Sequence, residues 1–188
     1  MFKLKFIIIL LFLPSGFGLL WHSFSINNLS EQLISFAFFV FCLEQAKMAF
    51  IDVKPCIFRL DNVQNSNLNL SYFFIVVIIT IVIELFGFYF ALFNVGWGAI
   101  FVLISQIWFN CFAQVKINEI DNQPIQYYFS DKIIVLGADF LCLLLMGLWI
   151  MNIYPLTIAF VMLFLTVSFI GVKYYFRLTQ CANHILNS

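Results

Sequence analysis

The chain has 188 residues, of which 64% are hydrophobic and only 10% are charged. A soluble domain carries roughly 45–50% apolar and about 25% charged residues, so the composition excludes an ordinary soluble domain. Nine basic and nine acidic residues give a formal net charge of zero, and no basic patch suggests nucleic-acid binding. The sequence therefore predicts an integral membrane protein whose first partner is the lipid bilayer.

The first apolar segment, 6–26, is long enough to cross a bilayer, although it contains Pro14, Gly16 and Gly18. The same stretch has features of a signal peptide, namely two early lysines, a short apolar run and small residues that would suit cleavage near residue 18. We expect a true span and keep cleavage, which would leave five spans, as the alternative.

The second segment, 33–51, is cleanly apolar only as far as Leu43. Glu44, Gln45 and Lys47 follow, so we expect this helix to emerge there into the headgroups. The remaining spans are clearer and lie at about 70–93, 97–115, 133–151 and 155–176. The predicted fold is an all-α, polytopic bundle of six transmembrane helices arranged as three hairpins.

The distribution of basic residues predicts the orientation of this bundle. With six spans, one side carries the N-terminus, the connections 44–69 and 116–132, and the C-terminal tail. All nine basic residues fall on this side: Lys3, Lys5, Lys47, Lys54, Arg59, Lys116, Lys132, Lys173 and Arg177. The positive-inside rule therefore predicts cytoplasmic N- and C-termini.

A polar pattern occurs twice in the chain. The motif C-x2-Q-x-K-x3-I-D-x2-P begins at Cys42 and again at Cys111, an offset of 69 residues. The pattern indicates a duplication of 1–69 in 70–138 as parallel repeats. Chance, combined with a shared need for polar residues where a helix leaves the membrane, is the alternative.

Ionisable side chains inside a membrane are costly, so each suggests a functional site. Glu84 and Gln106 each lie eleven residues from the turn centre at Val95, which places them at similar depth in an antiparallel hairpin. Thr80 and Asn110 lie one helical turn away on the same faces. These four residues could hold an ion, a proton or a polar ligand, or form a structural hydrogen-bond network around a protonated Glu84.

Asp139 is a secondary candidate nearer the cytoplasmic face. The geometry of the third hairpin brings it toward Ser168 and Gly171, and we expect a structural pairing with Lys132 or Lys173.

No metal site or cofactor is predicted. The two histidines are far apart in sequence, and none of the cysteines forms a CxxC pair. We interpret the cysteines as reduced, small apolar side chains: Cys42, Cys56, Cys111, Cys142 and Cys181.

Several strings in the chain resemble known sequences: residues 33–35 (LIS), 44–46 (EQA), 84–89 (ELFGFY) and 105–110 (SQIWFN). Together they are similar to a family of small uncharacterised cyanobacterial membrane proteins. The resemblance covers most of the chain and implies a plasma-membrane or thylakoid location. It implies no activity.

Three functions remain open from the sequence. The small size and short outer turns favour a non-enzymatic subunit, assembly factor or scaffold of a membrane complex, with other membrane proteins as partners. A small transporter or channel using Glu84 is the alternative. An enzyme acting on lipid or quinone through Glu84, Asp139 or His22 is less favoured, because no HExxH, GxSxG or Walker motif is present.

Overall fold

The computed structural model describes residues 2–60, 70–117 and 124–186. Its helices are α1 (Phe2–Ser25), α2 (Leu29–Leu60), α3 (Leu70–Phe90), α4 (Val95–Phe112), α5 (Phe129–Ile150) and α6 (Pro155–Leu186). All six are long and apolar enough to cross a membrane. The predicted bundle of six apolar helices is confirmed.

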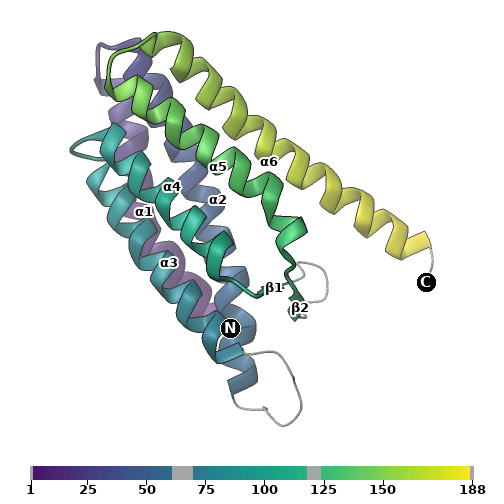
Figure 1. Cartoon of the computed structure of the whole chain (residues 1–188). Coiled ribbons are helices and arrows are strands. Elements are labelled where there is room, and N and C mark those ends of the chain that lie inside the picture. The colour runs from purple at the N-terminus through teal and green to yellow at the C-terminus, as the bar shows by residue number, and fades with distance from the viewer. Residues whose placement is uncertain (1, 61–69, 118–123, 187–188) are drawn as a thin grey trace.

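The helices run up and down an elongated bundle (Figure 1). The short turns that join α1 to α2, α3 to α4 and α5 to α6 lie at one end, and the start of α1 lies at the other. The last helix, α6, packs more extensively on α2 than on α5, its neighbour in sequence. Toward its C-terminal end α6 diverges from α5 (Figure 1).

The prediction of a purely helical chain misses one small β-structure. Strands β1 (Val115–Ile117) and β2 (Pro124–Gln126) pair antiparallel after the end of α4, with Lys116 opposite Ile125. This pair lies in the polar connection predicted at 116–132. It satisfies backbone groups that would otherwise need water where the chain leaves the helices.

The second helix extends well beyond the predicted segment 33–51. Glu44 and Gln45, where the helix is predicted to emerge into the headgroups, are buried within the bundle, with 5% and 7% of their surface exposed. The depth at which α2 leaves the membrane stays a prediction. The first helix also continues without a break across Pro14. Next to it, the Ser15 hydroxyl donates a hydrogen bond to the Phe12 carbonyl, so this polar group is satisfied inside the helix.

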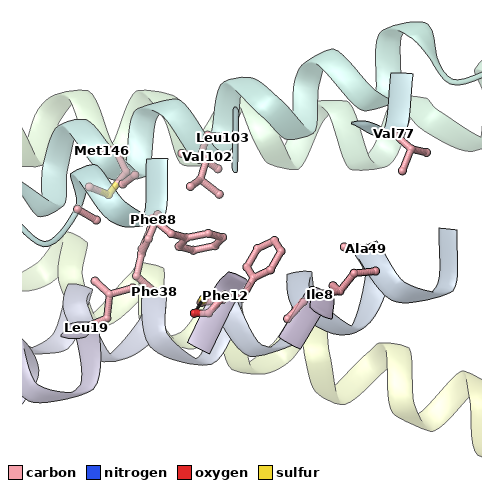
Figure 2. Packing of buried hydrophobic residues seen from close by; sticks show 14 of the residues in the cluster. Ile8, Phe12, Leu19, Phe38, Ala49, Val77, Phe88, Val102, Leu103 and Met146 are labelled. Carbon is pink, nitrogen blue, oxygen red and sulfur yellow. Dashed lines mark hydrogen bonds between the residues drawn. The ribbon is translucent and has the colours of Figure 1, made fainter. Parts of the chain in front are cut away.

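Aromatic rings join the two N-terminal hairpins. The rings of Phe12 on α1 and Phe88 on α3 meet edge to face, with centroids 5.9 Å apart (Figure 2). Phe38 on α2 contacts Phe88 at 6.1 Å in the same manner. These arrangements suit the charge distribution of aromatic rings, and they place α1 against both α2 and α3.

Helices α3 and α4 approach closely where both carry glycine. A Cβ added to Gly98 would lie 2.5 Å from the Cα and N atoms of Ala91. A Cβ added to Gly87 would lie 3.0 Å from the carbonyl oxygen of Gly98. Small residues at such crossings let membrane helices pack backbone to backbone, so the glycines fix the distance between α3 and α4.

The two copies of the repeated motif have different conformations. Gln45 and Lys47 lie within α2, whereas α4 has already ended when the chain reaches Gln114, and Lys116 lies in β1. Residues 120 and 121 of the second copy lie outside the described residues. The duplication of 1–69 in 70–138 therefore stays a prediction.

The first testable prediction concerns the contact between α3 and α4. We expect Gly98→Ala to destabilise the protein by about 1–3 kcal/mol, because the new methyl group meets backbone atoms that cannot move aside. Gly147→Ala is the matched control, since a Cβ at Gly147 meets nothing within 4 Å. Thermal unfolding in detergent, followed by circular dichroism, measures both. Equal unfolding temperatures for the two variants would contradict the close contact.

Candidate functional site

Glu84 and Gln106 are hydrogen-bonded across the interface between α3 and α4. The Gln106 Nε2 donates to Glu84 Oε1, and only 3% of the Glu84 surface is exposed. The equal spacing of these residues from the turn at Val95 brings them to the same depth. The structure thus places the two predicted residues together, while their function stays a prediction.

Asn110 connects this pair to α5. Its Nδ2 donates both to the carbonyl oxygen of Gln106, at 3.0 Å, and to Asp139 Oδ2, at 3.1 Å. Its Oδ1 accepts from the Tyr127 hydroxyl at 3.2 Å. Burial, reinforced by nearby carboxyl groups, raises the pKa of Tyr127 above its ordinary value, so the phenol keeps its proton and its role as donor.

A row of polar side chains therefore leads from Glu84 through Gln106 and Asn110 to Asp139 and Tyr127. We call this set the polar row. It begins within the apolar part of α3 and ends beside the strand pair. The bonds from Gln106 to Glu84 and from Asn110 to Asp139 join neighbouring helices, so the row stabilises the packing of α3, α4 and α5.

Two of the predicted members have other surroundings. The Thr80 hydroxyl donates to the Val76 carbonyl one turn earlier in its own helix, which satisfies this buried group locally. Ser168 is half-buried on α6, whereas Asp139 is directed toward α4. Asp139 forms a hydrogen bond with Asn110, and its predicted approach to Ser168 and Gly171 stays a prediction.

The predicted partners of Asp139 are bound elsewhere. Lys132 Nζ donates to the carbonyl oxygen of Ala113 at the end of α4, and it also lies 4.9 Å from the ring centroid of Tyr127. Lys173 contacts α2 instead. Lys132 therefore holds the start of α5 to the end of α4 through a backbone group and an aromatic face.

An ion pair between α2 and α6 was not predicted. Lys173 Nζ lies 2.7 Å from Glu44 Oε1, and Lys47 lies 3.5 Å from the same oxygen. Lys47 also donates to the Tyr174 hydroxyl at 3.2 Å and stacks over its ring. The signal that could have indicated this contact is that an acidic and a basic residue both lie near the ends of otherwise apolar segments that are remote from the short turns.

Of the three candidate residues for an enzyme, His22 lies apart from Glu84 and Asp139, which belong to the polar row. His22 Nδ1 hydrogen-bonds to the Ser35 hydroxyl at 2.9 Å, which joins α1 to α2. In the part of the chain that the structure describes, no hydrogen bond links His22 to Glu84 or Asp139. Over the same residues, no group of three or more His, Cys, Asp or Glu side chains is placed to hold a metal ion.

A groove of about 650 Å³ lies between α1 and α2. Its walls are apolar except at Lys47, and they include Phe12, Gly16, Cys42 and Leu43. A second hollow, of about 330 Å³, lies at the end of the bundle that carries the short turns, and its walls include Glu31.

Comparisons with protein-family models, curated proteins and solved structures found no match to this chain. The resemblance to the cyanobacterial membrane proteins therefore stays a prediction, and the function must be argued from the geometry.

The second prediction tests the Glu44–Lys173 ion pair. We expect Glu44→Gln to destabilise the protein by about 1–3 kcal/mol, because Lys173 loses its partner while remaining partly buried. Lys173→Met should do the same, and the double variant should lose less than the sum of the two. Equilibrium unfolding in mixed micelles measures all three. Strictly additive losses would show that the pair contributes no coupling.

Proposed function

We propose that the chain crosses the bilayer six times as three hairpins, with both termini in the cytoplasm. The proposal is supported by the positions of the nine basic residues, which all lie on elements at the ends of the hairpins remote from the short turns. The packing of α1 against α2 and α3 supports a retained first span. The membrane is the plasma membrane, or the thylakoid if the chain is cyanobacterial.

We further propose that the protein is a non-enzymatic subunit, assembly factor or scaffold that binds another membrane protein through α5 and α6. The last two helices bury a smaller share of their residues than the first four do. Only Lys132, Leu136 and Met146 are buried on the 22 residues of α5, whereas eight residues are buried on the 18 residues of α4. Ten of the 22 residues of α5 are exposed.

Glycines on these outward surfaces carry the proposal. A Cβ added to Gly137 on α5 or to Gly171 on α6 would meet nothing within 4 Å. A glycine offers lipid no apolar side chain to contact, but it lets the backbone of another helix approach closely. The open glycines and the sparse burial of α5 therefore fit a surface covered by a helix of a partner protein.

The third prediction tests this surface. Gly137→Leu and Gly171→Leu should reduce by at least tenfold the amount of partner that co-purifies with the chain from native membranes in mild detergent, because the new side chains hold the partner helix away. Val82→Phe, at an exposed position of α3, is the control and should retain the partner. A wild-type chain extracted only as a free monomer would contradict the proposal.

A small transporter or channel for protons or cations is the second candidate. The polar row supports it, because Glu84 is a buried carboxyl group within an apolar helix and hydrogen bonds continue from it toward the strand pair. Intramembrane carboxyl groups commonly mark ion and proton pathways.

The fourth prediction separates transport from structure. Glu84→Gln keeps the shape of the side chain and removes its titratable group. If the row conducts, proton flux into liposomes containing the purified chain should fall by at least tenfold, with the unfolding temperature little changed. Thr80→Val is the control, since Thr80 bonds only within its own helix. Flux equal in Glu84→Gln and wild type would exclude a transport role for this carboxyl group.

A further inference from the structure

The groove between α1 and α2 is elongated. Along α2 it runs from Phe39 to Ile51, which is about 18 Å at 1.5 Å per residue. Its volume is about 650 Å³, and its walls are apolar except at Lys47.

The groove exists because α1 carries a glycine where the two helices face each other. A Cβ at Gly16 would meet only the Cys42 Sγ, at an ordinary 3.8 Å. The space beyond that Cβ is unfilled, and Leu43 on the opposite wall is 57% exposed. The hollow is thus open to the surroundings of the bundle and lined by side chains that an acyl chain could contact.

A cluster of two basic side chains and one acidic side chain lies toward one end of the groove. Lys47 lines this end, close to Glu44 and Lys173. Glu44 lies nearer to Lys173, at 2.7 Å, than to Lys47, at 3.5 Å. One carboxylate thus faces two ammonium groups, and Lys47 contributes the charge that is not balanced within this cluster.

We propose that the groove binds one acyl chain of an anionic phospholipid from the cytoplasmic leaflet, with the lipid phosphate paired to Lys47. An apolar channel of this length with a cation at its cytoplasmic end complements such a lipid, because a basic residue near that surface attracts anionic headgroups. The inference rests on the proposed membrane orientation. It does not depend on the partner surface of α5 and α6, which lies on other helices.

The experiment titrates the full-length chain in detergent with dipalmitoyl phosphatidylglycerol or dipalmitoyl phosphatidylcholine and counts bound lipids by native mass spectrometry. We expect the wild type to bind phosphatidylglycerol about fivefold more tightly than phosphatidylcholine, the effect of one basic residue near the headgroup. Lys47→Gln should abolish this preference. Lys116→Gln, which changes the equivalent lysine of the second motif, should leave it intact.

A second pair of variants tests the acyl-chain part of the site. Gly16→Leu fills the groove and should weaken the binding of both lipids at least fivefold, whereas Leu10→Phe, at an exposed position of α1 outside the groove, should not. Circular dichroism checks folding, and Leu43→Trp fills the groove from α2 if Gly16→Leu fails to fold. Equal affinity of the wild type for the two lipids, or unchanged binding in the groove-filling variants, would overturn the proposal.

Discussion

Hydrocarbon offers no hydrogen bonds, so a polar side chain that enters the bundle is stabilised by a partner within the chain. This constraint accounts for the helices themselves, and it also decides which helices lie together. Gln106 binds Glu84 across α3 and α4, Asn110 binds Asp139 across α4 and α5, and Lys173 binds Glu44 across α6 and α2. The apolar contacts are broad and adaptable, whereas these polar contacts are few and directional, so the polar contacts set which neighbours are correct.

The position of α6 shows the effect of this constraint most clearly. A short turn would allow α6 to lie along the whole of α5, but it packs mainly on α2. Glu44 is buried on α2, and an unpaired carboxylate there would be costly. Lys173 supplies the partner and Tyr174 supplies a ring and a hydroxyl for Lys47. Moving α6 toward α5 would separate all of these groups, and it would also cover the outward surface of α5.

Much of this arrangement could be predicted from the sequence, because hydropathy and turn residues act locally. The six apolar segments follow from their hydropathy and length. The pairing of Glu84 with Gln106 follows from their equal distance from Val95 on two helices joined by a tight turn. The failures have a common cause. Hairpin geometry relates only the two helices that a short turn joins, so it did not indicate that Asp139 on α5 would bind Asn110 on α4. It also could not indicate that Glu44 would pair with Lys173, which lies 129 residues later in the chain.

The repeated motif shows how the same residues can come to differ in role. Lys47 and Lys116 occupy equivalent places in the two copies, yet Lys47 lies on a continuing helix beside α6, and Lys116 lies on a strand, with its ammonium group 5.8 Å from the ring centroid of Tyr127. The first copy can remain helical because α6 covers its polar residues. The second has no helix in that position, and its chain forms backbone hydrogen bonds with β2 instead. If the two halves arose by duplication, the packing of α6 on the first half alone accounts for their different conformations. Only in the first half does the lysine of the motif line an apolar groove.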